Sequence, residues 1–397
     1  MRFQHLPGAE TLLERYRSSC EIRPGLPEAE VHSEVLYTPA SRGVGIAYEG
    51  ALFDRNGARI AAADLVRERR TLNGGAPVAE RARVGGTGLY LGWLLPVYGH
   101  ALLESLARCW NQSAADFAVY HAPRRKRVPA FLRAHLDRLG VGEVVVPTEP
   151  TRFERLIVPW PAFEIRMRAY RGFADLFPRP AATDPRPVYV SRSRLATDAR
   201  AVAGEAALEP ALAAAGHRVV HPGTLSTAEQ LEVFASHRRY AGVIGSAMHN
   251  ILFNAAPEVV YLTDGEPNLN FLMCDELVGA DSLYVSCLDH GELPDLGRQM
   301  PLRPDLARAA DALGVSVDAG LQRSVDERHR EMWAEVRLKQ GLSARDRSAL
   351  RDVREHHSGP IAPRLARLAR ELLLSTSRRG RISPRSWASG LGRPARH

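Results

Sequence analysis

Residues 188–194, Val-Tyr-Val-Ser-Arg-Ser-Arg, join a short apolar run directly to a basic loop. A capped helix start follows at 225–231, and the turn Gly245-Ser246 leads into a second helix-like stretch. Three further apolar runs have the length of buried strands, at 217–220, 241–244 and 259–262. This alternation of strands and helices predicts a doubly wound α/β sheet. Ligands of such sheets bind at the carboxyl ends of the strands, where the polar residues of this stretch fall.

The composition is that of a soluble globular protein, since 45% of the 397 residues are hydrophobic and 25% are charged. This length predicts two domains. No run of about 18 apolar residues occurs, so we expect no membrane span. The first residues lack the apolar segment of a secretory signal. Four scattered cysteines without a CxxC pair predict a reduced, cytosolic protein without structural zinc.

The net charge is +8, and much of the excess is arginine in local clusters such as 124–127 and 378–381. A net positive charge favours anionic partners, namely nucleotides, nucleic acid or an anionic membrane face. The plainer interpretation is an arginine-rich composition with solvated faces. The use of alanine and arginine suggests a high-GC bacterial source.

Changes in composition divide the chain into five segments. An α/β domain is expected at 1–176 and a proline-rich linker at 177–187. A second α/β domain is expected at 188–300, followed by charged amphipathic helices at 301–374. Arginine, serine, glycine and proline dominate 375–397, which predicts a disordered basic tail.

Three local patterns describe the first half of the chain. The alternating segment 51–57 predicts a hairpin with an Asn-Gly turn. The stretch Gly85-Gly86-Thr87-Gly88 lacks the lysine that follows in a phosphate-binding P-loop, so it predicts only a flexible turn. The stretch 101–110 has helical periodicity.

Four motifs, taken in order, resemble glycosyltransferase family 61. They are Tyr98-Gly99-His100 with Glu104 and Arg108, the strand end 189–192, Leu225-Ser226-x-x-Glu229-Gln230, and Gly245-Ser246-Ala247-Met248-His249-Asn250-x-Leu252-Phe253. The resemblance covers roughly 100–262. It implies a GT-B-like architecture of two Rossmann-like domains facing a cleft. It also implies inversion at the anomeric carbon, a nucleotide-sugar as co-substrate, and no metal or other cofactor.

The chain departs from the family pattern at three places. Ala101 stands where many members have tryptophan, and Glu104 stands where many have aspartate. Gly204-Glu205 replaces the usual Asn-Glu. The second change keeps a carboxylate and so keeps the chemistry. The other two changes affect contacts with the sugar or the acceptor.

His100 and Glu104 are the candidate catalytic residues. They stand four apart on a predicted helix and therefore share a face. An inverting transfer needs a base that takes the proton of the acceptor hydroxyl. Either residue can be that base while the other orients it, and the sequence does not decide between them. The alternative for His100 is a capping or core histidine.

The candidate donor site combines a helix start with arginines. Gly245 and Ser246 precede a predicted helix whose free N–H groups suit a diphosphate, and Ser246 is also expected to cap that helix. Arg192 and Arg200, with Arg194 as a weaker candidate, supply guanidinium groups that bind phosphate. Since no paired aspartates stand ready for a cation, these arginines would stabilise the leaving diphosphate instead of a metal.

Three further residues have both a binding and a structural interpretation. His249 and Asn250 are expected to contact the phosphates or the sugar, although Asn250 can equally fix the turn. Glu229 either approaches the nucleotide ribose or caps its own helix.

The sequence therefore predicts an inverting, metal-independent glycosyltransferase of surface polysaccharide biosynthesis. It would move a sugar from a nucleotide-sugar to a glycan or lipid-linked acceptor. We expect a cytoplasmic protein in peripheral contact with the anionic inner face of the membrane. One alternative is a non-catalytic basic module that binds nucleic acid or a partner, although no nucleic-acid motif is present. Another is an inactive protein of glycosyltransferase fold.

Overall fold

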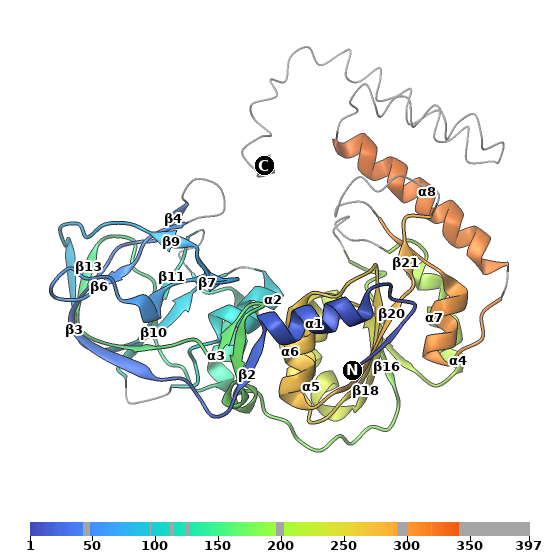
Figure 1. Ribbon diagram of the computed structural model, residues 1–397, viewed down its shortest axis with the longest axis horizontal. Coiled ribbons are helices and arrows are strands. Elements are labelled where there is room, and N and C mark those ends of the chain that lie inside the picture. The colour runs from blue at the N-terminus through green and yellow to red at the C-terminus, as the bar shows by residue number, and fades with distance from the viewer. Residues whose placement is uncertain are drawn as a thin grey trace, which may run out of the picture. The chain divides into compact units, whose positions relative to one another are not determined.

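The structure is a computed structural model that describes residues 1–42, 48–95, 97–111, 115–123, 127–195, 202–291, 301–318 and 320–340 (Figure 1). It divides into two compact units. The first unit comprises Met1–Val188, Leu225–Tyr261 and Glu266–Tyr284, and the second comprises Tyr189–Thr224, Leu262–Gly265 and Val285–His397. Both contain helices and strands, which confirms the α/β class. The predicted tail at 375–397 and the candidate Arg200 lie outside the described residues.

The first unit contains a mixed six-stranded sheet in the order β12-β11-β10-β13-β3-β6. The strands are β3 (Ala29–Tyr37), β6 (Leu52–Phe53), β10 (Ala82–Trp93), β11 (Phe117–His121), β12 (Val144–Val145) and β13 (Thr151–Pro159). The pairs β10–β11, β10–β13 and β11–β12 are parallel, whereas β13–β3 and β3–β6 are antiparallel. Buried aromatic and branched side chains of these strands, such as Tyr90, Val119 and Phe153, form its core.

The glycine-rich stretch that was predicted to be a flexible turn lies inside β10, so that prediction was wrong. The register of β10 against β13 shifts between Val84 and Thr87, and Gly86 there has a φ of 83°. A Cβ atom on Gly88 would come within 2.5 Å of the Phe117 ring and 2.7 Å of Leu156. The glycines therefore allow a bulge and close packing of neighbouring strands, rather than flexibility.

Two hairpins flank this sheet. The predicted Asn-Gly turn is confirmed, because Asp54 N donates to Ala58 O at 2.8 Å and Gly57 has a φ of 81°. The second hairpin joins β7 (Val66–Arg67) to β8 (Arg70–Thr71) by the two residues Glu68 and Arg69. Their φ values are 49° and 62°, as in the hairpin turns that usually contain asparagine and glycine.

The helix predicted near residue 100 exists but ends early. It begins as α2 (Tyr98–His100) and continues as a π-helical turn, Ala101–Ser105. The bond from Leu106 N to Ala101 O, 3.1 Å long, closes the wider ring of a π-helix. Residues 106–110, which were also predicted to be helical, form turns. Short π-helical turns are frequent at functional sites.

A second sheet, most of whose residues belong to the first unit, alternates strands and helices as predicted. The strands β18 (Arg239–Val243), β19 (Glu258–Thr263), β20 (Asp281–Ser286) and β1 (Arg2–Gln4) lie in the order β1-β20-β19-β18. The helices that connect or precede them are α5 (Thr227–Ser236), the 3₁₀ helix η6 (Ser246–Phe253) and α6 (Leu269–Val278).

The remaining elements of the first unit belong to neither of these two sheets. They are α1 (Ala9–Ser19), β2 (Glu21–Arg23), β4 (Ser41–Arg42), β5 (Tyr48–Glu49), η1 (Ala61–Ala63), β9 (Asn73–Gly74), α3 (Ala130–Arg138), β14 (Phe163–Glu164), β15 (Arg168–Tyr170) and η3 (Arg171–Leu176). The strands β14, β15 and β2 form a small sheet of their own. No helix or strand falls within 177–187, where a linker was predicted.

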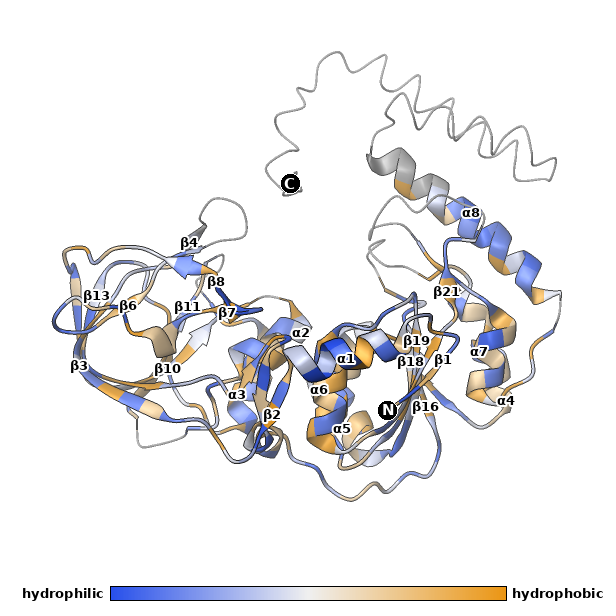
Figure 2. Cartoon of the chain, in the orientation of Figure 1, coloured by the Kyte–Doolittle hydropathy of each residue, from blue (hydrophilic) through white to orange (hydrophobic). Residues whose placement is uncertain are grey.

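The second unit contains β16 (Val188–Val190) next to β17 (Arg218–Val220), with η4 (Glu205–Ala207) and α4 (Glu209–Ala214) between them in sequence. It continues with η5 (Pro222–Thr224), β21 (Leu288–Asp289), β22 (Arg303–Pro304), α7 (Leu306–Leu313) and α8 (Leu321–Gln340). Helices were predicted at 301–374; α7 and α8 confirm them as far as Gln340, and 341–374 lie outside the described residues. Figure 2 shows that α8 is largely hydrophilic, and it buries Val325, His329 and Trp333 at a spacing of four.

Candidate functional site

His100 and Glu104 meet as their spacing predicted. The His100 Nδ1 atom lies 2.6 Å from Glu104 Oε2. The carboxylate is nearly buried, with 6% of its side chain exposed, whereas 37% of the His100 side chain is exposed. The helical turn therefore places an accessible imidazole on a carboxylate that solvent barely reaches.

Arg67 is the third member of this group. Its Nε donates to Glu104 Oε1 at 2.7 Å and its Nη2 donates to Glu104 Oε2 at 2.8 Å. Such a two-pronged contact neutralises the buried charge and fixes the plane of the carboxylate. Sequence reasoning missed Arg67, because Val66-Arg67-Glu68-Arg69-Arg70 resembles an ordinary charged surface. Only the hairpin β7–β8 brings it to the helix.

The hydrogen bonds assign the tautomer of His100. An ionised carboxylate only accepts hydrogen bonds, so the 2.6 Å contact places the proton on Nδ1 of His100. Arg67 Nη2 also lies 3.4 Å from this atom, but a guanidinium only donates, and that longer contact is the weaker one. Nε2 of His100 then carries the lone pair, as in a histidine base oriented by a carboxylate.

The glycine–serine turn packs directly against this helix within the first unit. A Cβ atom on Gly99 would lie 3.2 Å from His249 Nδ1 and 3.3 Å from Ser246 Oγ. The Tyr98 hydroxyl donates to Asn250 Oδ1 at 2.7 Å. Two motifs about 150 residues apart in sequence are therefore in contact, and Gly99 permits their close approach.

His249 is buried and neutral. The pKa of its imidazole is lowered to about 4, mainly by burial and to a smaller extent by the neighbouring His100, while the contact with the Ser246 carbonyl opposes this shift. Nδ1 lies 3.2 Å from the Ser246 carbonyl, which can only accept, so the proton sits on Nδ1. The ring stacks on Phe271 at a centroid distance of 4.3 Å. Nε2 is therefore a hydrogen-bond acceptor held in a fixed orientation.

Two buried polar atoms of η6 have no hydrogen-bond partner among the described residues. They are His249 Nε2, an acceptor, and Asn250 Nδ2, a donor. Asn250 is fully buried, and its other polar atom already accepts from Tyr98. Buried polar groups are nearly always hydrogen-bonded, so this pair marks a place where water or a ligand group binds.

The start of η6 differs from the prediction in two respects. The capping position is Gly245, and Ser246 is the first helical residue, so Ser246 does not cap this helix. The helix is also 3₁₀ rather than α-helical, which narrows it and aligns residues three apart. Gly245 has a φ of −177°, an extended conformation that any residue adopts.

Arg192 belongs to the second unit, and a buried carboxylate supports its loop. The Arg192 backbone N–H donates to both oxygens of Glu205 at 3.1 Å, and the Tyr189 hydroxyl donates to Oε1 at 3.1 Å. Burial raises the pKa of Glu205 to about 7 despite these bonds. A Cβ on Gly204 would lie 2.6 Å from Val325 on α8. The departure Gly204-Glu205 is therefore structurally accommodated.

Glu229 caps its own helix. Its Oε2 accepts from the Ser226 backbone N–H at 2.7 Å, while the Ser226 hydroxyl accepts from Glu229 N at 3.3 Å. This reciprocal capping box confirms the predicted start of α5. It accounts for the Ser-x-x-Glu motif without a ligand.

Two absences concern only the part of the chain that the structure describes. In that part no group of three or more histidine, cysteine, aspartate or glutamate side chains is arranged to hold a metal ion. None of the helices in that part is long and apolar enough to cross a membrane.

Comparison with known proteins bears on the same stretch of chain. No curated protein matches the sequence. The family model described as "Glycosyltransferase 61" matches residues 98–262, which is less than half of the chain but includes Tyr98, His100, Glu104, Arg192 and Asn250. The resemblance drawn from the motifs is thereby confirmed, and over these residues the chain is similar to glycosyltransferase family 61.

Proposed function

We propose that the protein is an inverting, metal-independent glycosyltransferase that moves a sugar from a nucleotide-sugar to a glycan or lipid-linked acceptor. The observation that carries this proposal is the group of His100, Glu104 and Arg67 packed against η6, whose two buried polar atoms have no partner. The family supports glycosyl transfer in general. The GT-B-like pair of domains at 1–176 and 188–300 belongs to the proposal.

In the proposed mechanism His100 is the base. Its Nε2 takes the proton of the acceptor hydroxyl as the hydroxyl oxygen forms a bond to the anomeric carbon. The bond from that carbon to the diphosphate oxygen breaks, and its electron pair leaves with the nucleoside diphosphate. Glu104 stabilises the imidazolium that forms, and Arg67 holds the carboxylate in place.

His249 and Asn250 suit a sugar hydroxyl better than a phosphate. A hydroxyl donates one hydrogen bond and accepts others, so it can pair with an acceptor such as His249 Nε2 or with a donor such as Asn250 Nδ2. A phosphate oxygen carries lone pairs and negative charge, so the lone pair of a neutral His249 would repel it. We assign the diphosphate instead to Arg192, Arg200 and the N–H groups at Gly245 and Ser246, where cationic and amide donors replace a metal.

The setting of the reaction is part of the proposal. The basic charge of +8 suits work at an anionic membrane face, where lipid-linked acceptors reside. This supports surface polysaccharide biosynthesis in the cytoplasm, with peripheral contact at the inner face of the membrane. The alternative of a nucleic-acid-binding module gains no support from any described contact.

The first experiment measures thermal stabilisation by UDP, GDP, CDP, TDP and CMP, each with and without EDTA. A ligand that binds only the folded state raises the melting temperature. We expect one nucleotide to stabilise the protein equally in EDTA. The corresponding nucleotide-sugars are then tested for release of nucleoside diphosphate. Stabilisation that EDTA abolishes would refute metal independence. Nucleotide binding without turnover of any donor would favour an inactive protein of this fold.

A further inference from the structure

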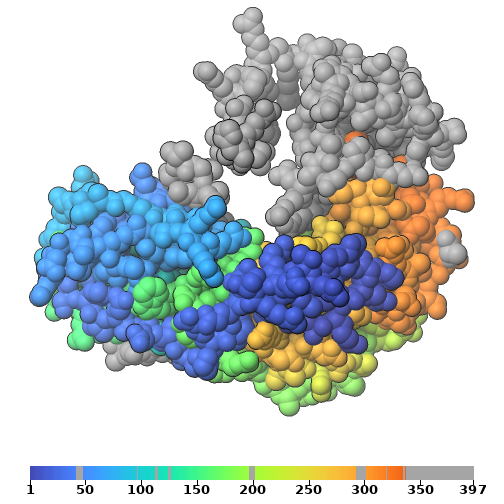
Figure 3. Space-filling view, in the orientation of Figure 1, coloured from blue at the N-terminus to red at the C-terminus, as the bar shows by residue number. Residues whose placement is uncertain are grey.

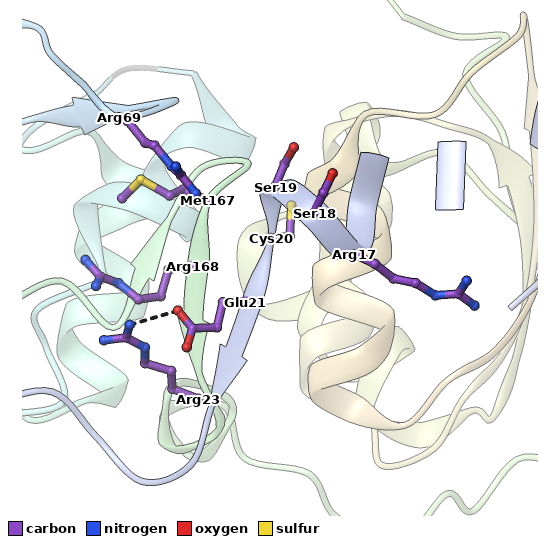
Figure 4. A pocket seen from close by; sticks show the side chains of 9 residues that line it. All are labelled: Arg17, Ser18, Ser19, Cys20, Glu21, Arg23, Arg69, Met167 and Arg168. Atoms are coloured by element: carbon purple, nitrogen blue, oxygen red, sulfur yellow. Dashed lines mark ion pairs between the residues drawn. The ribbon is translucent and has the colours of Figure 1, made fainter. Parts of the chain in front are cut away.

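A cavity of about 430 Å³ lies in the first unit where α1 ends (Figure 4). Three segments line it: the junction of α1 and β2, the β7–β8 turn, and the start of β15. In the space-filling view the N-terminal segment, drawn in dark blue, is at the molecular surface (Figure 3). This volume is within the range of small-molecule sites, about 300–1,000 Å³.

The lining is strongly basic, with Arg17, Arg23, Arg69 and Arg168 against the single carboxylate of Glu21. Arg23 Nη2 lies 2.8 Å from Glu21 Oε2. Figure 4 shows these two side chains next to Arg168, with Arg69 extending from the neighbouring hairpin and Arg17 directed away. Guanidinium groups bind phosphate oxygens in two-pronged contacts, so the lining suits a phosphate group.

The cations of this cavity differ in how far they are already engaged. Arg168 donates to the buried carboxylate of Glu164 through Nε at 3.0 Å and Nη2 at 2.7 Å, which orients its guanidinium. Arg69 makes no hydrogen bond or ion pair with any other described residue. One arginine is therefore fixed by the fold, and another is available to a ligand.

The β7–β8 turn holds Arg69 in this place at a conformational cost. Both Glu68 and Arg69 have left-handed φ angles, 49° and 62°, without being glycine or asparagine. Such residues cost of order 1–3 kcal/mol each and concentrate at functional sites. Glu68 Oε1 pairs with Arg166 Nη1 at 2.8 Å, which ties the turn to the loop before β15. The strained turn is thus anchored to the residue before Met167 and Arg168, which line the cavity.

The same hairpin carries the residue that holds the catalytic carboxylate. Arg67, which binds Glu104, stands two residues before Arg69, so their Cα atoms are at most about 7 Å apart. In an inverting transfer the attacking hydroxyl and the leaving diphosphate are on opposite sides of the sugar carbon. One hairpin thus supplies both Arg69 of the cavity and Arg67, which holds the carboxylate partner of the proposed base, so we place the cavity on the side of the acceptor.

We propose that this cavity binds a phosphate or diphosphate group carried by the acceptor, an inference that rests on the proposed glycosyl transfer. Arg23, Arg69 and Arg168 bind the anion, and the adjacent sugar of the acceptor presents its hydroxyl to His100. The acceptor is then either a soluble sugar phosphate or a lipid-linked sugar diphosphate, which share this chemistry.

The test uses inorganic pyrophosphate and the full chain in isothermal titration calorimetry. The variant is the double substitution Arg23→Gln/Arg69→Gln. Both side chains are accessible, and glutamine, like arginine, is a long side chain without β-branching, so the backbone at position 69 should be little affected. The control is Arg55→Gln, an exposed arginine outside the cavity lining. We expect at least tenfold weaker binding in the double variant and wild-type binding in the control, because each charge-assisted hydrogen bond contributes severalfold or more.

Pyrophosphate can also occupy the donor site, so Arg192→Gln is measured in parallel. The inference is overturned when wild-type protein does not bind pyrophosphate at millimolar concentration, when the double variant binds as tightly as wild type, or when only Arg192→Gln weakens binding. None of these measurements requires sugar transfer. A failed inference is therefore distinct from a failed function, which the nucleotide and turnover assays decide.

Sedimentation with vesicles distinguishes a lipid-linked acceptor phosphate from a soluble one. Phosphatidylcholine vesicles with and without phosphatidic acid are compared for wild type and the Arg23→Gln/Arg69→Gln variant. Cosedimentation that needs phosphatidic acid and both arginines supports a lipid-borne phosphate. Pyrophosphate binding that depends on these arginines, without any such cosedimentation, supports a soluble acceptor phosphate.

Discussion

Replacing Glu104 by glutamine tests the proposed catalytic group most directly. The carboxylate accepts three hydrogen bonds from ionic or ionisable donors, at 2.7 and 2.8 Å from Arg67 and at 2.6 Å from His100 Nδ1. Glutamine keeps the shape but removes the charge, and it replaces one acceptor oxygen by an NH₂ group that faces donors. The variant therefore loses the group that stabilises a protonated His100.

The expected size of the effect follows from these contacts. Hydrogen bonds to charged groups contribute about 1.5–3 kcal/mol each, and the amide keeps part of them, so we expect about 2–4 kcal/mol less stability. A correctly oriented general base accelerates proton transfer by about 10²–10⁴. Loss of its carboxylate partner should therefore lower kcat by about 10³, or about 4 kcal/mol in activation free energy.

The assay is release of nucleoside diphosphate at saturating donor and acceptor, together with urea unfolding. The matched control is Asp64→Asn. Asp64 is another mostly buried carboxylate. It accepts from Arg59 at 2.9 and 2.7 Å and from Asn73 at 3.2 Å, and its carboxylate forms no hydrogen bond or ion pair with His100, Glu104 or Arg67. We expect a similar loss of stability in the control and a kcat within threefold of wild type. This separates catalysis from folding.

Two results would contradict this reasoning. A fall in kcat of less than tenfold in Glu104→Gln would mean that the carboxylate does not assist the base. A smaller loss in His100→Ala than in Glu104→Gln would reverse the roles and make Glu104 the base. If His100 is the base, the double variant His100→Ala/Glu104→Gln should be no slower than His100→Ala alone, because the effects of residues that act as one unit are not additive.

Three further predictions concern the surroundings of the site. Gly99→Ala should slow transfer at least tenfold and cost about 1–3 kcal/mol of unfolding free energy, because its Cβ presses on His249, whereas Gly142→Ala, in open space, should change neither. The free energy of unfolding should fall by about 2 kcal/mol from pH 7 to pH 5 because of His249. Its folded pKa of about 4 lies below the unfolded value, so the unfolded chain binds the proton first as the pH falls. Urea titrations in which the His249→Gln variant keeps the full pH dependence would contradict this. Ser226→Ala removes the cap of α5 and should lower the free energy of unfolding by about 1 kcal/mol. Glu229→Gln should keep the wild-type KM for the donor, because Glu229 serves only the cap. A raised KM would instead indicate that Glu229 contacts the donor.

Sequence reasoning succeeded where the signal was local. The start of α5 is written in four residues, because the side chains of Ser226 and Glu229 satisfy each other's backbone N–H groups. The spacing of His100 and Glu104 likewise needs only one helical turn to bring them together. In both cases the interacting atoms are close in sequence, so the rest of the fold has little influence.

It failed where packing at a distance decides the conformation. Gly88 was assigned to a flexible turn because its glycine-rich stretch lacks the lysine of a P-loop, yet the close approach of Phe117 and Leu156 requires a glycine there, inside a strand. Ser246 was expected to cap a helix, but Gly245 takes the capping position. Neither outcome follows from a short window of sequence, since each depends on residues from another element.

Arg67 shows why the proposed catalytic group was only partly predictable. It stands 37 residues before its partner Glu104, on a strand of two residues. A charged pentapeptide carries no hydropathy period, and the turn Glu68-Arg69 lacks the asparagine and glycine that announce a hairpin. The available signal is the unusual density of arginine in 67–70, which a purely solvated surface does not need.

The position of Arg67 also bears on which residue is the base. Both oxygens of Glu104 are occupied by Arg67, and burial leaves 6% of the side chain exposed, so an acceptor hydroxyl has no open oxygen to approach. His100 is the more exposed of the two, and its Nδ1 proton is engaged, which leaves Nε2 for the substrate. A base must reach the proton it removes, so geometry favours His100. Arg67→Met should then act through Glu104 as a loss of positioning, lowering kcat without changing donor KM. Full activity in that variant would show that Glu104 keeps its place without the arginine.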